Sequence, residues 1–279
     1  MLIEANELIN YYLNQKWHNN IIILDASWYL PIQNRDAYKE YLNKHIPKAL
    51  FFDIDKVCDT NSTLPHTVPN EKQFKLNMEE LGITNQDHII IYSIDGIGTS
   101  PRAWWLFKLF GHQKISILNG GLKAWSKIND TENNHVPKNS KSDYKAIINH
   151  KLLCNYLDIE AAYKNNNQQI VDARSKGRFK GIENEPRPGL KRGHIPKSIN
   201  IPFSFLIDEQ GYLLKKDELI KILNINNFNF EKSTISTCGS GVTACVLAFA
   251  LDFIGKNNWS IYDGSWSEWG SKKESLIEI

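Results

Sequence analysis

The chain has 279 residues, of which 42% are hydrophobic and 23% are charged, and its formal net charge is +2. This composition supports a packed core and excludes a disordered chain. Both signs of charge are spread along the sequence, which gives no reason to expect nucleic acid or a membrane surface as a partner. No apolar stretch approaches the length of a membrane span.

The chain has four cysteines, Cys58, Cys154, Cys238 and Cys245. They form no CxxC motif and no cluster with histidines, so we expect no zinc site. A protein of this size needs no disulfides. The first residues lack the basic end and apolar run of a signal peptide. We therefore expect a cytoplasmic, reduced protein in which a reactive thiol stays available.

The first half of the chain alternates between helical and strand patterns. Apolar residues recur at helical spacing over Leu2–Trp17, and a buried-strand run follows at Ile21–Leu24. Pro101 stands where a first-turn proline would open a helix that continues to Phe110. The other elements predicted in this half are a helix over Glu71–Leu81, strands over His88–Tyr92 and Ile115–Leu118, and a helix over Leu122–Ile128. This alternation predicts an α/β fold with a mainly parallel sheet flanked by helices.

The second half repeats motifs of the first half in the same order. The matched pairs are Leu24-Asp25-Ala26-Ser27 with Val171-Asp172-Ala173-Arg174, His45-Ile46-Pro47-Lys48 with His194-Ile195-Pro196-Lys197, and Leu118-Asn119-Gly120-Gly121 with Tyr262-Asp263-Gly264-Ser265. These pairs lie 144–149 residues apart, which indicates two copies of a domain because solenoid repeats are much shorter. We predict domains at 1–129 and 150–279, joined by a linker at 130–149. We interpret the histidines of the two HIPK motifs as turn anchors.

The sharpest chemical signal is the segment STCGSGVTA in the second copy. A strand is predicted over Thr234–Thr237 and a buried helix over Thr243–Ile254, which places Cys238 on the loop between them. The loop glycines Gly239 and Gly241 allow several N–H groups to point toward one place. The following helix adds the positive end of its dipole.

Such a loop stabilises a thiolate or a persulfide anion. We therefore predict that Cys238, in an exposed loop position, is a nucleophile. Cys245 falls within the apolar helix and is expected to be a buried structural residue. Cys58 and Cys154 have no comparable setting.

The segments CGSGVTA and YDGSWSEW resemble the mercaptopyruvate sulfurtransferases of the rhodanese superfamily. The similarity covers nearly the whole chain and includes DASWYL at 25–30, HIPKALFFDID at 45–55, SPRAWWLFKLFGH at 100–112 and VDARSKGRFKGIENEPRPGLKRGHIP at 171–196. It implies two tandem rhodanese-like domains, of which only the second is catalytic, with the active site where the copies meet. The first-copy loop, Tyr92–Ser100, has no cysteine, as this implies. Lys48 and Lys197 stand where the family usually has glycine.

The resemblance also implies roles for individual residues. Arg178 in GRF and Arg187 in EPRPG match substrate-binding arginines, and the planar fork of arginine suits a carboxylate. The residues expected to bind the substrate within the loop are Gly239, Gly241, Val242 and Thr243. The residues that match a set proposed to assist proton transfer are Ser240, His66 and Asp55. A polar contact between the copies without a catalytic role remains the alternative for that set.

Residues near Cys238 distinguish between possible reactions. Phosphatases on this fold need an arginine at the position of Ala244 to grip a phosphate. Thiosulfate sulfurtransferases have two basic residues directly after the cysteine, where this chain has the neutral Gly239 and Ser240. We therefore predict 3-mercaptopyruvate as the donor, with its carboxylate on the arginines and away from the loop.

The reaction that the resemblance implies needs no metal and no organic cofactor. Cys238 would take the donor sulfur as a persulfide and release pyruvate. The acceptor would be cyanide, a small thiol or a thioredoxin-like protein. Two alternatives remain open, namely a thiosulfate-specific enzyme and a persulfide carrier module with little small-molecule turnover.

Overall fold

The computed structural model describes residues 1–13, 21–133 and 142–279. These residues group into two compact units. Unit 1 comprises Met1–Thr60, Val68–Asn149 and Glu209–Leu213, and unit 2 comprises Asn61–Thr67, His150–Asp208 and Leu214–Ile279. Each unit thus includes a short segment from the other half of the chain. Part of the predicted linker, 134–141, lies outside the described residues, and the predicted domain boundaries stay a prediction.

Unit 1 is built on a five-stranded parallel sheet with the strand order β1-β5-β4-β2-β3. The strands are β1 (Leu2–Ile3), β2 (Ile21–Asp25), β3 (Leu50–Phe51), β4 (His88–Tyr92) and β5 (Ile115–Leu118). The helices are α1 (Ala5–Leu13), α2 (Ala37–Asn43), α3 (Glu71–Glu80), α4 (Ser100–Leu109) and α5 (Gly121–Trp125), with a 3-10 turn η1 (Pro31–Gln33).

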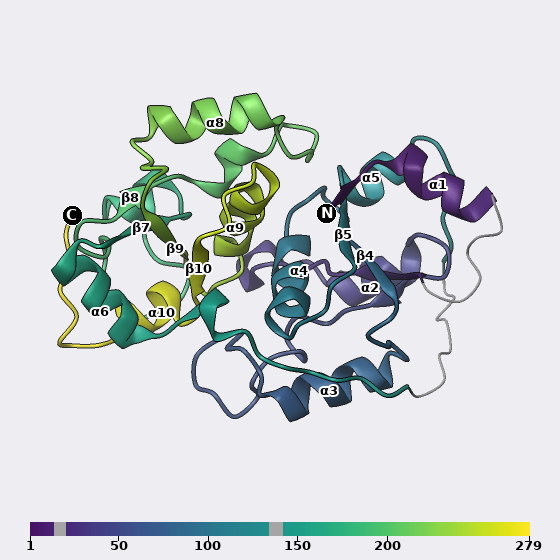
Figure 1. Cartoon of the computed structure of the whole chain (residues 1–279), viewed down its shortest axis with the longest axis horizontal. Coiled ribbons are helices and arrows are strands. Elements are labelled where there is room, and N and C mark those ends of the chain that lie inside the picture. Colours follow the sequence, from purple (N-terminus) through teal and green to yellow (C-terminus); the bar gives the residue numbers. More distant parts are fainter. Residues whose placement is uncertain (14–20, 134–141) are drawn as a thin grey trace. The chain divides into compact units, whose positions relative to one another are not determined.

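Unit 2 repeats this topology, because its parallel sheet has the order β6-β10-β9-β7-β8. The strands are β6 (Leu153–Cys154), β7 (Gln168–Asp172), β8 (Ile199–Asn200), β9 (Ser233–Thr237) and β10 (Trp259–Tyr262). The helices are α6 (Tyr156–Asn165), α7 (Lys176–Phe179), α8 (Lys216–Ile225), α9 (Ala244–Phe253) and α10 (Ser265–Trp269), with 3-10 turns η2 (His150–Leu152) and η3 (Phe203–Leu206). Figure 1 shows α8 and α6 on opposite sides of this sheet. The predicted parallel α/β fold in two copies is confirmed.

The N-terminal segment differs from the predicted long helix. Leu2 and Ile3 form the edge strand β1, and the helix α1 begins only at Ala5. The backbone explains this difference, since Ile117 N–H donates to the carbonyl of Met1 and Asn119 N–H donates to the carbonyl of Ile3. Helical spacing of apolar residues cannot reveal such a pairing with a distant strand. Residues 14–17 of the predicted helix lie outside the described residues.

Both HIPK histidines anchor turns, as predicted. His45 Nδ1 lies 2.7 Å from the carbonyl oxygen of Tyr41, and the two rings stack with centroids 4.4 Å apart. His194 Nδ1 lies 2.9 Å from the carbonyl oxygen of Phe179, and these rings stack with centroids 3.8 Å apart. The same motif therefore performs the same structural task in each unit.

The lysines that follow these motifs adopt left-handed backbone conformations, with φ of 62° at Lys48 and 60° at Lys197. Their backbone N–H groups donate to the carboxylates of Glu132 and Glu278, each at 3.1 Å. Glycine, which the similar family usually has at these positions, would adopt this conformation without the strain that a Cβ causes.

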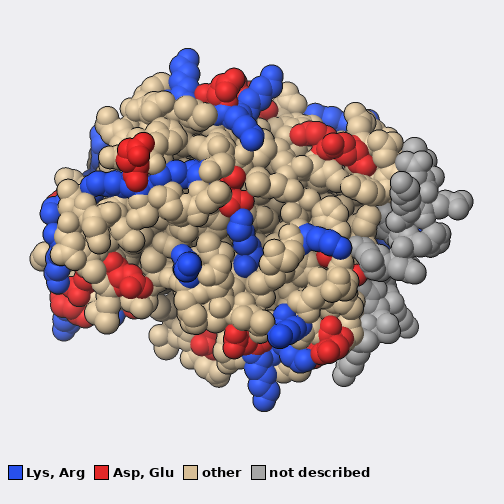
Figure 2. All heavy atoms as spheres, viewed as in Figure 1, with Lys and Arg blue, Asp and Glu red and all other residues tan. Residues whose placement is uncertain are grey.

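Charged side chains of both signs are mixed across the face shown in Figure 2. Within the ranges that the structure describes, no helix is both long and apolar enough to cross a membrane. The most apolar helix is instead part of the core of unit 2, because every residue of α9 from Ala244 to Asp252 is buried. This buried helix begins directly after the loop that carries Cys238.

Candidate active site

Cys238 follows the last residue of β9 at the carboxyl edge of the unit 2 sheet. Two neighbouring strands end beside it, with Thr237 paired to Asp172 of β7 and Ser236 paired to Ile261 of β10. The carboxyl edge of a parallel sheet is where such folds place their ligand sites. The Cys238 residue is only 2% exposed, so the expectation of an exposed loop position is wrong. The loop itself is largely buried, since Ser240, Gly241 and Val242 are buried as well.

The beginning of α10 holds the backbone of the cysteine loop. Trp266 N–H donates to the carbonyl of Cys238 at 3.0 Å, and Cys238 N–H donates to Ser265 Oγ at 3.1 Å. The carbonyl of Gly239 accepts hydrogen bonds from Ser267 N–H at 2.8 Å and from Ser267 Oγ at 2.7 Å. The segment YDGSWSEW therefore supports the cysteine loop, a role that its sequence alone did not reveal.

The loop presents several backbone donors that no described residue uses. The N–H groups of Gly239, Ser240, Val242 and Thr243 make no hydrogen bond within the described part of the chain. Gly241 has a φ of 77°, which turns the chain through the left-handed region. Together with the N-terminus of α9, these donors form a nest that suits an anion.

The equivalent loop of unit 1 differs in two ways. Ser93 occupies the position of Cys238, and its carbonyl accepts a hydrogen bond from Leu122 N–H at 3.1 Å as the Cys238 carbonyl does from Trp266. The residue equivalent to Val242 is Ile97, and its N–H is not free but donates to the carbonyl of Gly211 at 2.8 Å. The unit 1 loop therefore has neither a thiol nor a fully open nest.

Arg178, on the short helix α7, reaches the cysteine loop. An ideal Cβ built on Gly239 would lie 2.9 Å from Arg178 Nη2, so the guanidinium group lies against the Cα of this glycine. The Arg178 side chain is 19% exposed. The loop therefore has a cation beside it, although the two residues that follow Cys238 are neutral.

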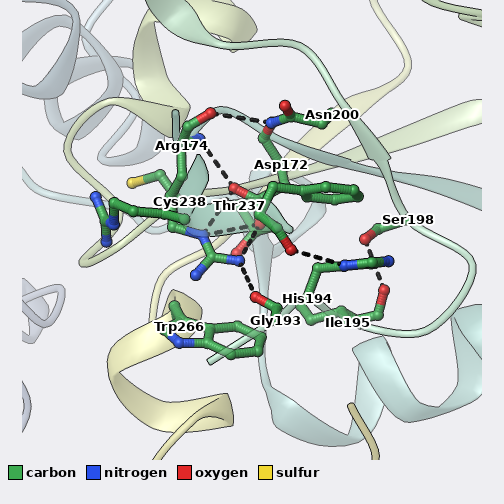
Figure 3. A network of polar contacts seen from close by, with 12 residues as sticks. Asp172, Arg174, Gly193, His194, Ile195, Ser198, Asn200, Thr237, Cys238 and Trp266 are labelled. Carbon is green, nitrogen blue, oxygen red and sulfur yellow. Dashed lines mark hydrogen bonds and ion pairs between the residues drawn. The ribbon is translucent and has the colours of Figure 1, made fainter. Parts of the chain in front are cut away.

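A buried network of charges leads from the sheet to Arg178. Arg174 Nε and Nη2 donate to the Asp172 carboxylate, at 2.9 and 2.6 Å, and Arg174 Nη2 donates to the Gly193 carbonyl at 2.8 Å (Figure 3). The Arg174 guanidinium also lies 4.1 Å from the ring centroid of Trp266. Arg174 Nη1 then donates to Glu185 Oε1 at 2.8 Å.

Glu185 also accepts from Arg178. Its Oε2 atom receives hydrogen bonds from Arg178 Nε at 3.1 Å and from Arg178 Nη2 at 2.5 Å. The Glu185 side chain is 3% exposed. No role was predicted for Glu185 or Arg174, although both lie in the segment 171–196 that contains Arg178 and Arg187. The available signal for Glu185 was its place in the sequence as an acidic residue between Arg178 and Arg187.

Two members of the predicted proton-transfer set, His66 and Ser240, lie within hydrogen-bond distance of each other. His66 Nδ1 lies 3.1 Å from Ser240 Oγ, and both side chains are buried. His66 comes from the first copy, but its segment Asn61–Thr67 groups with unit 2. Asp55 belongs to unit 1, where its carboxylate accepts hydrogen bonds from Trp28 Nε1 at 3.0 and 3.1 Å.

The second predicted arginine, Arg187, is half-buried in the segment between α7 and β8. The other residues expected to bind substrate, Gly239, Gly241, Val242 and Thr243, all lie on the cysteine loop. Arg178 and this loop are therefore the part of the predicted substrate site that the structure brings together.

The three remaining cysteines have settings unlike that of Cys238. Cys245 is fully buried in α9, and its thiol donates to the carbonyl of Gly241 at 3.1 Å. Burial raises the pKa of Cys154 to about 11 and also raises the pKa of Cys58, which disfavours their thiolates. A pocket of about 530 Å³ lies beside Cys154, lined also by His150, Lys151 and Ser260, and not by Cys238.

In the described residues, no cluster of histidine, cysteine and acidic side chains could hold a metal ion.

Comparison with known proteins gives a family match over both halves of the chain. The family model described as a rhodanese-like domain matches residues 9–128 and 157–272. The 3-mercaptopyruvate sulfurtransferase of Escherichia coli (strain K12) is 40% identical over 259 residues, which cover 92% of each chain. The human 3-mercaptopyruvate sulfurtransferase is 39% identical over 249 residues, 88% of this chain and 84% of the relative.

Other similar proteins are named for a different sulfur donor or are known as solved structures. The thiosulfate sulfurtransferase of Rattus norvegicus is 39% identical over 250 residues, 88% of this chain and 84% of the relative. Among solved structures, the Tum1 protein from Saccharomyces cerevisiae matches with a TM-score of 0.91 and 30% identity, covering 99% of this chain and 97% of that one. Since relatives named for either donor are equally similar, overall identity cannot choose between donors, and the residues around the cysteine must.

Proposed function

Because this chain belongs to the rhodanese-like family of sulfurtransferases, we propose that it moves sulfur from 3-mercaptopyruvate to an acceptor through a persulfide on Cys238. The observation that carries this proposal is the Cys238 loop, with unused N–H donors around the thiol and the Arg178 guanidinium against Gly239. An anionic donor fits such a site.

The donor would be held at its carboxylate by Arg178. Arginine binds carboxylates through parallel, charge-assisted hydrogen bonds, which are about twice as strong as neutral ones. Arg187, in the same segment, is the second arginine that we propose for this task. With the carboxylate beside Gly239, the donor sulfur can reach the thiolate of Cys238, and the loop N–H groups can stabilise the persulfide that forms.

In the first half-reaction, the Cys238 thiolate attacks the sulfur of 3-mercaptopyruvate and forms the S–S bond. The C–S bond breaks, and its electron pair stays on carbon as the enolate of pyruvate. A proton converts this enolate to pyruvate, and the outer sulfur remains on Cys238. His66 and Ser240, joined at 3.1 Å, are the groups that we propose to deliver the proton, with Asp55 as the third member of the set.

In the second half-reaction, an acceptor nucleophile attacks the outer sulfur of the persulfide, and the Cys238 thiolate leaves. The acceptors that we propose are cyanide, which becomes thiocyanate, a small thiol, or a thioredoxin-like protein. This cycle requires a reduced thiol, and a reducing compartment such as the cytoplasm would maintain it.

Thiosulfate is the second candidate donor, because Arg178 beside the loop would also attract a dianion and some similar relatives bear that name. The loop itself argues against thiosulfate. Its positions after the nucleophile, Gly239 and Ser240, provide no second cation for the extra negative charge. A persulfide carrier with little small-molecule turnover is the third hypothesis. It would release neither pyruvate from 3-mercaptopyruvate nor sulfite from thiosulfate.

The test compares kcat/KM for 3-mercaptopyruvate and thiosulfate on the wild type and on Arg178→Ala. We expect a clear preference for 3-mercaptopyruvate and a loss of about 10–100-fold in Arg178→Ala, as expected when a charge-assisted hydrogen bond of about 1.5–3 kcal/mol is removed. The matched control is Arg192→Ala in the same segment, where the arginine is bonded to Asn184. An equal or higher kcat/KM for thiosulfate would contradict the predicted preference, and release of neither pyruvate nor sulfite would support the carrier.

A further inference from the structure

Glu185 is the buried acid that joins two arginines behind the cysteine loop. Its side chain is 3% exposed, and each carboxylate oxygen accepts from a different guanidinium, Oε1 from Arg174 and Oε2 from Arg178. We propose that Glu185 is the positioning residue of the donor site, which holds the Arg178 guanidinium against Gly239 in the orientation that binds the donor carboxylate. This proposal rests on the proposed function of Arg178.

The hydrogen bonds define which edge of Arg178 is left for a ligand. Glu185 takes the Nε and Nη2 groups, at 3.1 and 2.5 Å. The Nη1 group has no acceptor within the described part of the chain, so the edge left for a ligand is the one that carries Nη1. Arginine side chains lose about 2 kcal/mol of rotamer freedom when they are fixed, so an arginine that is already held binds a ligand at a lower entropic cost.

The two arginines differ in how firmly they are held. Arg174 is fully buried and is fixed by Asp172, by the Gly193 carbonyl and by the ring of Trp266. In contrast, Arg178 has only Glu185 as a side-chain acceptor among the described residues and is 19% exposed. A disturbance at Glu185 should therefore move Arg178 and leave Arg174 in place.

Replacing Glu185 by glutamine keeps its volume but removes one acceptor. The glutamine oxygen can accept from one guanidinium, and its NH₂ group then faces the N–H donors of the other. The change also adds one net positive charge to the network, which favours anion binding in general. We expect the loss of orientation to outweigh the added positive charge. Two N–H donors that face each other in a buried site force the mobile Arg178 away from Gly239.

The experiment measures KM and kcat for 3-mercaptopyruvate in the wild type, Glu185→Gln, Arg178→Ala and the double variant. Glu185→Gln should raise KM by about tenfold and change kcat by less than about threefold, the pattern for an interaction that binds substrate and transition state alike. The double variant should be no worse than Arg178→Ala, because Glu185 acts through that arginine. The discharge of preformed persulfide to cyanide should be unchanged.

The matched control is Glu183→Gln, since Glu183 lies in the same segment and its carboxylate accepts from Ser175 rather than from an arginine. It should leave KM within about twofold of the wild type. An unchanged or lower KM in Glu185→Gln, a further loss in the double variant, or a slower discharge of persulfide would each overturn the positioning role. A wild type that releases no pyruvate would instead refute the proposed function.

Discussion

Lys197 illustrates how a single residue can carry strain without a role in the chemistry. Its φ of 60° lies in the left-handed region, which costs a residue with a Cβ about 1–2 kcal/mol. The turn that it forms keeps the Lys197 N–H bonded to Glu278 at 3.1 Å, and this bond does not need the lysine side chain. The local hydrogen bond therefore compensates for a residue that fits the turn poorly.

We expect Lys197→Gly to stabilise the protein by about 1 kcal/mol, because relief of the strain exceeds the extra flexibility of glycine in the unfolded chain. The measurement is urea unfolding of the variant beside the wild type. The control is Lys215→Gly, where φ is −63° and no strain is relieved. If both variants lose stability equally, the left-handed conformation at Lys197 is not strained.

Asp25 and Asp172 occupy equivalent positions at the ends of β2 and β7 but have different partners. Asp172 is paired with the buried Arg174, whereas the equivalent residue to Arg174 in unit 1 is Ser27, which donates to Asp25 through its N–H and hydroxyl groups. Burial outweighs these hydrogen bonds and raises the pKa of Asp25 to about 6.

This raised pKa predicts a pH dependence of stability. The folded protein binds the Asp25 proton more tightly than the unfolded chain, whose carboxyl has a pKa near 4. Between about pH 4 and pH 6 the free energy of unfolding should therefore fall as pH rises, by a total on the order of 3 kcal/mol from this group, and then stay level. Asp25→Asn should remove this fall and be more stable than the wild type at pH 8, as measured by urea unfolding at both ends of the range. An unchanged pH profile in Asp25→Asn would contradict the assignment.

The cysteine loop and its counterpart in unit 1 show how one element can be open in one copy and filled in the other. Val242 N–H has no partner in the described residues, but its equivalent, Ile97 N–H, donates to the carbonyl of Gly211. Gly211 belongs to the segment Glu209–Leu213, which also packs against the unit 1 loop so closely that a Cβ on Gly96 would lie 2.5 Å from the Cα of Gly211.

We expect Gly211→Ala to destabilise unit 1 by about 2 kcal/mol or more, since its Cβ would lie 2.7 Å from the Asp95 carbonyl oxygen, in a backbone with φ of 90°. Gly255→Ala is the matched control, because Gly255 has a φ of 92° but no atom within 4 Å of an added Cβ. Thermal unfolding of both variants separates the clash from the cost of the backbone conformation. Equal losses would show that the close packing of Glu209–Leu213 contributes nothing.

The elements that depend on local patterns could be predicted from the sequence. The apolar runs at Ile21–Asp25 and His88–Tyr92 are strands, and the turn, strand and helix around Cys238 follow from its glycines and the apolar run behind it. Elements that depend on distant pairing could not be predicted. The edge strand at Leu2–Ile3 exists only because it pairs with β5.

The same limit applies to the site. Motifs pointed to Cys238 and Arg178 as candidate site residues, but the position of Arg178 against Gly239 involves Glu185 and the buried pair of Asp172 and Arg174. No periodicity encodes such contacts between a loop segment and the end of a strand. The burial of Cys238 was also missed, because connecting loops usually lie on the surface.

The two units share one topology but differ in the loop that follows the central strand of each sheet. Both sheets have the same strand order, and both loops receive the same hydrogen bond after the strand, from Leu122 in unit 1 and from Trp266 in unit 2. Only the second loop has a cysteine, so we propose that unit 2 carries the chemistry. Unit 2 includes the segment Asn61–Thr67, and the first copy thus supplies His66 to Ser240.

The most direct test of this account is to locate the transferred sulfur after treatment with 3-mercaptopyruvate. Peptide mass spectrometry should find one added sulfur atom on the peptide that contains Cys238, with one pyruvate released for each persulfide formed. Cys245→Ala should still acquire this sulfur, and Cys238→Ser should not. Sulfur found instead on Cys58, Cys154 or Cys245, or continued turnover by Cys238→Ser, would contradict covalent catalysis at Cys238.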